Sequence, residues 1–218
     1  MRLSASDLLR RDAVTSPSAV PDALSLPLGR VVATEKKPNT PHEFHFWTAI
    51  DAPIGIGTIV RVEGNTPVEN VIPRVYGVAV EGFSYSDLQS PLHDVLGHDG
   101  RPHAGPLSHT DRTEIRLYTA SVLRHIPEEP LQPVPLGAVY LADDADVAVA
   151  LRMDGYITGE SSTGIPVGVY RAGGMRSPIF LDADFLVGPE AAHLNISGVS
   201  GLATKTSAIE WLLQSIFA

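Results

Sequence analysis

The chain has 218 residues, of which 44% are hydrophobic and 19% are charged, and it contains 19 glycines and 18 prolines. This composition is typical of a globular protein with short strands and many turns, and it argues against a helical bundle or a disordered chain. A net charge of −9 makes the chain as a whole repel nucleic acid, and the lack of cysteine excludes disulfides, thiolate zinc sites and cysteine nucleophiles.

The first 27 residues are predicted to form an arm or linker. The stretch from Thr15 to Pro21 is rich in serine and proline, and a short helix is expected only at Ala5 to Arg11. No apolar run in the chain approaches the roughly 20 residues of a membrane-spanning helix, and the N-terminus lacks the apolar stretch of a signal peptide. We therefore expect a soluble, cytoplasmic protein.

A β-barrel domain is predicted at residues 28–127. Runs rich in β-branched and aromatic residues, separated by turn residues, predict strands at Gly29 to Glu35, Glu43 to Ala49, Gly57 to Glu63, Val75 to Gly82, Thr113 to His125 and Gly137 to Ala142. Six strands at this spacing favour a barrel, which would also hide the strand edges. In the second run, Phe44 and Phe46 share one face and are expected in the core.

A long surface loop is expected to interrupt the barrel near residues 84–112. It carries four histidines among three aspartates: His93, His98, His103 and His109 with Asp94, Asp99 and Asp111. These residue types can bind a catalytic metal, but such sites usually have tighter spacing on a rigid helix or strand. The proline and glycine content of the loop favours a solvated segment whose histidines at most respond to pH.

Residues 128–190 are predicted to form a connecting α/β segment. Its start, at 128–135, is rich in proline, which is typical of a domain boundary. A short helix is expected from Asp143 to Met153, capped by Asp143 or Asp144. Strands at Pro166 to Arg171 and at Pro178 to Leu181 would follow, and then a helical turn at 182–186.

The last segment, residues 191–218, has the pattern of a phosphate-binding loop. An apolar strand from His193, a loop of small residues, a Lys-Thr pair and an amphipathic run from Ala208 to Phe217 follow one another. In this arrangement backbone amides and a helix N-terminus hold phosphates. Lys205 would reach the β and γ phosphates of ATP, and the Thr206 hydroxyl would bind Mg²⁺. The predicted nucleotide-binding residues are Gly198, Ser200, Gly201, Ala203, Thr204, Lys205, Thr206 and Ser207.

The loop departs from the common pattern Gly-x4-Gly-Lys-Thr. Counting back from Lys205 places Thr204 and Val199 where the two glycines belong. One extra loop residue brings Gly198 into the first position, whereas the second remains Thr204. A glycine-bearing turn that merely connects a strand to a helix is the alternative interpretation.

The sequence around this loop resembles the HerA family of hexameric ATPases. The residues that carry the resemblance are Leu28-Gly29-Arg30-Val31-Val32, Gly57-Thr58-Ile59-Val60-Arg61-Val62, the lead-in from Gly188 to Gly198 and the variant loop itself. The resemblance implies an N-terminal β-barrel followed by a RecA-like P-loop motor. It also implies a homo-oligomeric ring, hexameric in the parent protein, that translocates or unwinds DNA with ATP and Mg²⁺, with a nuclease or other effector as partner and antiviral defence as one setting.

Taken together, the expected fold is mainly β with an α/β C-terminal part: a β-barrel followed by the first strand, loop and helix of a truncated RecA-like domain. Such a chain would bind phosphate but not turn over ATP alone, because hydrolysis needs an acidic residue on a later strand and an arginine from the neighbouring subunit. The alternative function is a non-enzymatic module in which the barrel builds an oligomer or docks a partner and the loop is only structural.

Overall fold

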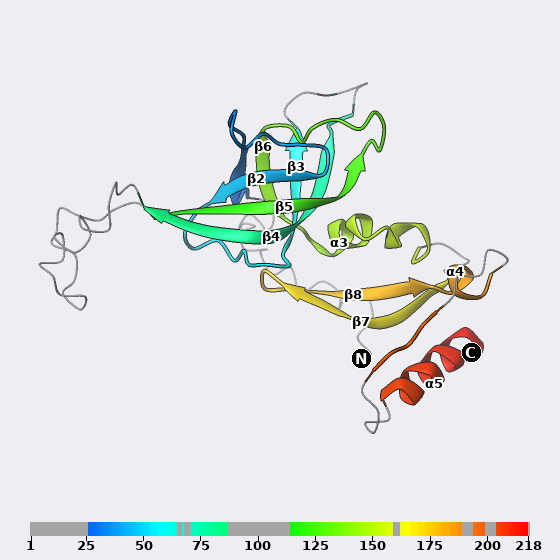
Figure 1. Ribbon diagram of the computed structural model, residues 1–218. Helices are drawn as coiled ribbons and strands as arrows, with labels where there is room; N and C mark the ends of the chain where they lie inside the picture. The colour runs from blue at the N-terminus through cyan, green and yellow to red at the C-terminus, as the bar shows by residue number, and fades with distance from the viewer. Residues whose placement is uncertain are drawn as a thin grey trace, which may run out of the picture.

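Six antiparallel strands form a closed barrel in the order β1-β2-β5-β4-β3-β6 (Figure 1). This computed structural model describes residues 26–64, 67, 71–86, 114–158, 162–188, 194–198 and 204–217. The strands are β1 Gly29–Val32, β2 Glu43–Thr48, β3 Ile59–Gly64, β4 Arg74–Ser86, β5 Glu114–Ile126 and β6 Gly137–Leu141. The prediction of a mainly β chain with a barrel is therefore confirmed.

The barrel extends beyond the boundary that the sequence placed at residue 127. Strand β6 pairs with β1 on one side and with β3 on the other, so it covers two edges that would otherwise be open. The preceding proline-rich stretch lies against the barrel, because Val134 is buried in the barrel core. The barrel therefore ends at Leu141. Residues 128–135 connect two of its strands and pack on it, rather than linking it to another domain.

The barrel interior is filled by side chains from all six strands. Along β2, Phe44 and Phe46 point inward and are fully buried, and the Phe46 ring stacks on Tyr118 with their centroids 5.3 Å apart. Valines and alanines fill the remaining space, which is typical of a barrel too narrow for a ligand. The predicted core role of the two phenylalanines is confirmed, whereas Trp47 lies on the outer face and is 40% exposed.

Gly77 lies where the pairing of β4 with β5 shifts register, directly beneath the Phe44 ring. A Cβ atom at this position would lie 2.5 Å from Cε1 of Phe44 and 3.1 Å from the carbonyl oxygen of Ser121. Neither neighbour can withdraw easily, because the ring is fully buried and the carbonyl belongs to β5.

We expect Gly77→Ala to lower the free energy of unfolding by about 1–3 kcal/mol, the usual cost of overpacking a core. Gly55→Ala is the matched control, because a Cβ at Gly55 meets no atom within 4 Å. Urea denaturation followed by circular dichroism would measure both variants. Equal stability of the two would contradict the close contact between Gly77 and Phe44.

A second core joins the outside of the barrel to helix α3, Asp144–Ala150, and the short 3₁₀ helix η2, Met153–Gly155. Val147 of α3 is fully buried in this cluster together with Ile59 and Tyr76 of the barrel. Asp143 caps the helix, as predicted: its carboxylate accepts a hydrogen bond from the Asp146 amide at 2.7 Å. The helix ends earlier than predicted because Arg152 adopts a left-handed conformation with φ of 59°.

Beneath α3 lies the two-stranded hairpin of β7, Gly164–Ala172, and β8, Met175–Asp182, which continues into the short helix α4, Ala183–Val187 (Figure 1). The predicted strands and helical turn are confirmed here. Tyr170 ties the hairpin to the barrel, because its hydroxyl donates to the Gly57 carbonyl at 2.8 Å and accepts from the Ile59 amide at 2.7 Å. Burial raises the pKa of Tyr170 further above the ordinary tyrosine value, which already lies well above neutral pH.

Helix α5, Thr204–Phe217, lies alongside β7 (Figure 1), and the indole Nε1 of Trp211 donates to the Pro166 carbonyl at 3.1 Å. Within the parts of the chain that the structure describes, no helix is both long and apolar enough to cross a membrane.

Strands β4 and β5 continue past the ends of their barrel neighbours and form a two-stranded arm (Figure 1). Ser84 to Ser86 are therefore strand residues, and the expected surface loop begins later than predicted, because pairing with β5 persists to Ser86. The rest of that loop, with its four histidines, lies outside the described residues.

Candidate phosphate-binding site

The two ends of the predicted phosphate loop lie next to each other. Helix α5 begins at Thr204, which places Lys205 and Thr206 in its first turn. The side chain of Lys205 turns back toward the start of the loop, and its ammonium Nζ donates to the carbonyl oxygen of Gly198 at 2.9 Å. A cation, a helix start and a glycine carbonyl thus meet across the loop.

Not every predicted loop residue can be placed. Thr206 and Ser207 are exposed on the first helical turn, where a hydroxyl can reach a ligand bound at the helix start. Thr204 is the first helical residue. The loop residues between Gly198 and Thr204, including Ser200, Gly201 and Ala203, lie outside the described residues.

The electrostatics of the helix start suit an anion. Helix α5 is 14 residues long, and its aligned peptide dipoles place about half a positive charge at its N-terminus. No acidic residue lies in its first turn, so no side chain of that turn offsets the charge. The Lys205 ammonium adds a full positive charge at the same end, and this combination favours phosphate over a neutral ligand.

The segment before the loop differs from the prediction. Leu194 to Gly198 belong to no strand, although the pattern predicted the first strand of a RecA-like sheet. A segment forms a strand only where it exchanges backbone hydrogen bonds with a neighbouring strand. Within the described ranges this segment pairs with no strand. The apolar residues of the segment were therefore not enough to predict a strand.

Much of the apolar surface of helix α5 is exposed. Trp211 is 51% exposed, and Ile209, Leu213 and Phe217 are also exposed. Among the described helices and strands, the main neighbour of α5 is β7.

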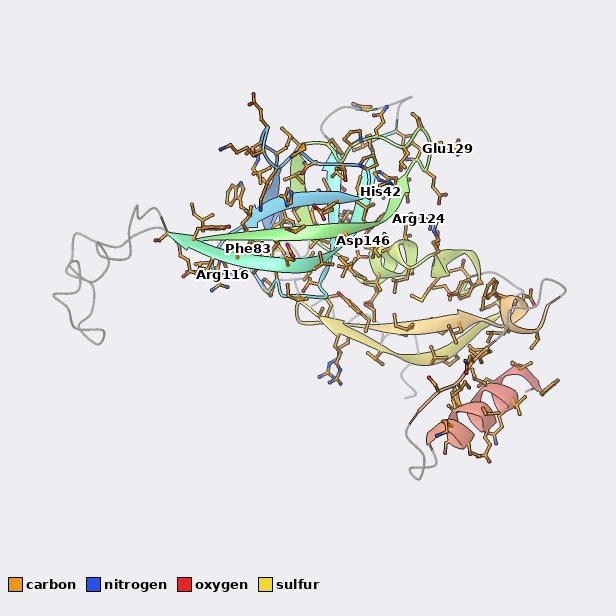
Figure 2. The ribbon with its side chains drawn as sticks, in the orientation of Figure 1. His42, Phe83, Arg116, Arg124, Glu129 and Asp146 are labelled. Atoms are coloured by element: carbon orange, nitrogen blue, oxygen red, sulfur yellow. The ribbon has the colours of Figure 1, made fainter. Side chains whose placement is uncertain are left out.

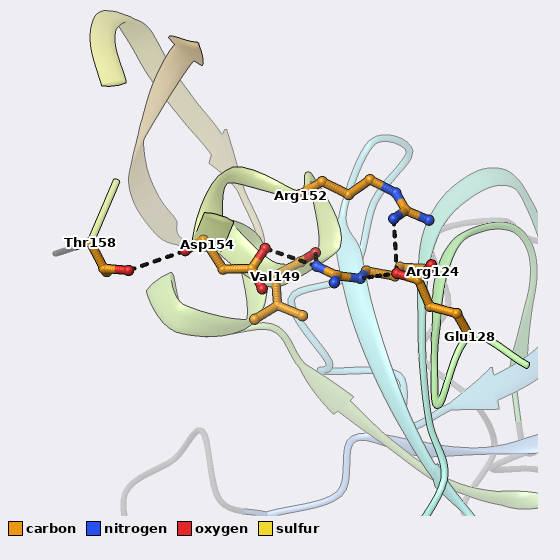
Figure 3. Close-up of polar contacts among 6 residues, drawn as sticks. All are labelled: Arg124, Glu128, Val149, Arg152, Asp154 and Thr158. Carbon is orange, nitrogen blue, oxygen red and sulfur yellow. Dashed lines mark hydrogen bonds and ion pairs between the residues drawn. The ribbon is translucent and has the colours of Figure 1, made fainter. Parts of the chain in front are cut away.

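A second polar cluster joins the end of β5 to η2 (Figure 3). Arg124 lies 3.0 Å from Glu128 and 2.8 Å from Asp154, and Arg152 lies 2.8 Å from Glu128. Hydrogen bonding from Arg152, joined by Arg124, lowers the pKa of Glu128. The two arginines and the two carboxylates neutralise each other. This cluster therefore fits a structural role, in which it holds η2 against the end of β5, better than a ligand site.

A third polar cluster, which was not predicted from the sequence, is centred on Asp146 of α3 (Figure 2). This buried carboxylate accepts hydrogen bonds from Arg61 at 2.7 Å and from the Tyr76 hydroxyl at 3.2 Å. Burial and the nearby Asp146 charge raise the pKa of Tyr76. The signal that could have found the cluster is Arg61, a cation in the middle of an apolar strand run.

Among the described side chains, no group of three or more histidines or carboxylates is arranged to hold a metal ion. A scan against protein-family models finds no family that matches this sequence, and a search of curated proteins finds no match.

Proposed function

We propose that this chain binds the phosphates of a nucleotide, ATP with Mg²⁺, at the loop between Gly198 and Thr206, as the barrel-bearing front part of a HerA-like ring ATPase that acts on DNA. The observation that supports it best is the Lys205 ammonium held 2.9 Å from the Gly198 carbonyl at the start of α5. A lysine in this place can exchange one carbonyl oxygen for phosphate oxygens with little movement of its backbone.

The residues present fit such a ligand. The amides at the start of α5 and the Lys205 ammonium would hold the β and γ phosphates, and the Thr206 hydroxyl would help to bind Mg²⁺. Bound Mg²⁺ would screen the charge of the phosphates. Hydrolysis requires in addition an acidic residue that positions water and an arginine from a neighbouring subunit, so our proposal for this chain is limited to binding.

Replacement of Lys205 tests the proposal. We expect Lys205→Ala to weaken MgATP binding by a factor of about 10–100, because a hydrogen bond to a charged group contributes about 1.5–3 kcal/mol. Isothermal titration of the chain with MgATP would measure this. Lys36→Ala is the matched control, since Lys36 is an exposed lysine in a turn and its loss changes the net charge equally. Equal heats from the Lys205→Ala and Lys36→Ala variants would contradict the nucleotide site.

A second function has its own support. The barrel carries a projecting arm with exposed aromatic residues, Phe83 and Tyr85, and such surfaces commonly mark protein interfaces. We propose on this basis that the barrel builds a homo-oligomer or docks an effector such as a nuclease, with or without nucleotide. Measurement of the mass in solution tests the oligomer, and a strictly monomeric species would count against self-assembly.

A further inference from the structure

The arm formed by β4 and β5 has one open strand edge. Strand β3 pairs with β4 from Arg74 to Val78, and the last backbone bonds on this side join Ala79 to Gly57 and Thr58. Beyond Ala79 no described residue forms a backbone hydrogen bond with this edge, while the other edge of β4 pairs with β5 as far as Ser86. The peptide groups from Glu81 to Tyr85 that face away from β5 therefore form an edge strand.

This edge lacks the features that usually prevent strands from pairing. From Glu81 to Tyr85 it contains no proline and no lysine, and its one charge is Glu81 at the base of the arm. The register shift between Ala79 and Glu81 lies before the edge, where it bends β4 as the strand leaves the barrel. The remaining edge is regular and extended.

One face of the arm is apolar and continues onto the barrel. The strand registers place Phe83 beside Leu117 and Leu117 beside Trp47, so an apolar row crosses three strands. Tyr85 and Ile115 form the next row, and both are more than 40% exposed. Figure 2 shows Phe83 at the base of the projecting arm. The rings of Phe83 and Tyr85 lie 6.2 Å apart, and the Lys37 ammonium lies 5.5 Å from the Phe83 ring centroid.

We infer that this edge pairs with the same edge of a second copy of the chain, antiparallel about a twofold axis through Phe83. The inference rests on the assembly function proposed above and names its surface. A twofold axis perpendicular to the sheet keeps each side chain on its face, so the apolar rows of the two copies join.

The position of the axis follows from the side chains. With Phe83 at the centre, Phe83 faces its own copy, Gly82 faces Ser84, and Glu81 faces Tyr85. The tyrosine hydroxyl can then donate to the Glu81 carboxylate, and no two like charges are opposed. A second copy fits this edge because the pairing is self-complementary: Phe83 meets Phe83, and each Glu81 carboxylate meets a tyrosine hydroxyl. Nucleic acid does not fit it, because the edge contributes no cation for a phosphate.

Charge substitution at Phe83 tests the pairing with the full chain. Sedimentation velocity over a range of concentrations would measure self-association of the wild type, of Phe83→Lys and of Phe83→Glu. We expect each variant alone to associate at least tenfold more weakly, because two like charges meet at the axis. An equimolar mixture of the two should recover association, since lysine then faces glutamate. Phe185→Lys is the matched control, as Phe185 is a 63% exposed phenylalanine on α4, away from the arm.

The outcomes separate the inference from the function on which it rests. A wild type that stays monomeric at every concentration would overturn both the proposed self-assembly and the edge pairing. A wild type that associates as strongly as both Phe83 variants would overturn the edge pairing alone, and so would a mixture that fails to recover association. Circular dichroism of each variant would verify that the barrel is folded, which the 39% exposure of Phe83 leads us to expect.

Discussion

Replacement of Asp146 by alanine is expected to lower the free energy of unfolding by about 3 kcal/mol, because it leaves a largely buried arginine without its main partner. Chemical denaturation of the wild type and of Asp146→Ala would measure the difference. This is one of the two largest effects that we predict for a single substitution in the chain.

The size of this effect follows from the contacts of Asp146. One carboxylate oxygen accepts from Arg61 at 2.7 Å, and the other accepts from the Tyr76 hydroxyl at 3.2 Å. The Asp146 side chain is 7% exposed and that of Arg61 is 19% exposed, so water replaces the lost bonds poorly. Arg61 Nε is buried and lies 3.3 Å from Glu63 in an ion pair without hydrogen-bond geometry. Because this ion pair remains in Asp146→Ala, we expect a loss in the free energy of unfolding at the lower end of the usual range of about 3–5 kcal/mol.

A matched control and a double variant make this test specific. Asp51→Ala removes the same charge from an exposed turn and should change stability by less than about 0.5 kcal/mol. The double variant Arg61→Met with Asp146→Leu removes both charges and should recover most of the loss, because no unpaired charge remains buried. If Asp146→Ala alone were as stable as Asp51→Ala, the contact between barrel and helix would contribute nothing.

Replacement of Phe44 by alanine is expected to cost about 3–5 kcal/mol, the usual loss for a buried aromatic side chain. Phe44 is fully buried in the barrel, its ring centroid lies 5.8 Å from that of Phe46, and the ring packs on Gly77. The closed strand ladder around the ring cannot collapse into the space that it leaves, so a cavity remains.

Phe185→Ala is the matched control for Phe44, because it removes the same side chain from an exposed position on α4. Thermal and urea unfolding would measure both variants. We expect Phe185→Ala to remain within about 0.5 kcal/mol of the wild type. A similar loss in both variants would show that the barrel interior does not dominate stability.

These experiments also distinguish the two proposed functions. Loss of MgATP binding in Lys205→Ala with unchanged mass would support a nucleotide site independent of assembly. Loss of association in the Phe83 variants with unchanged MgATP binding would support the barrel as an assembly module. The two sites lie on different elements, α5 and the β4–β5 arm, so each substitution should leave the other site intact (Figure 1).

Much of the fold could be predicted from local patterns. The alternation around Phe44 and Phe46 predicted β2 and its inward face, and the aspartate at 143 predicted the start of α3. These features depend on side-chain period and capping, which act over a few residues. Within the candidate site, the Lys-Thr pair predicted the helix that follows it, and α5 begins one residue before Lys205.

The sequence by itself determined most of the segments that form strands and helices and which of their faces are apolar, because those properties arise mainly from neighbouring residues. Only the tertiary structure decided that β6 closes the barrel, that the Lys205 ammonium meets the Gly198 carbonyl, and that Arg61 pairs with Asp146 85 positions away. It also decided that Leu194 to Gly198 form no strand and that β4 leaves the barrel with an open edge. Strand pairing and buried ion pairs depend on partners distant in the chain, so the sequence alone does not reveal them.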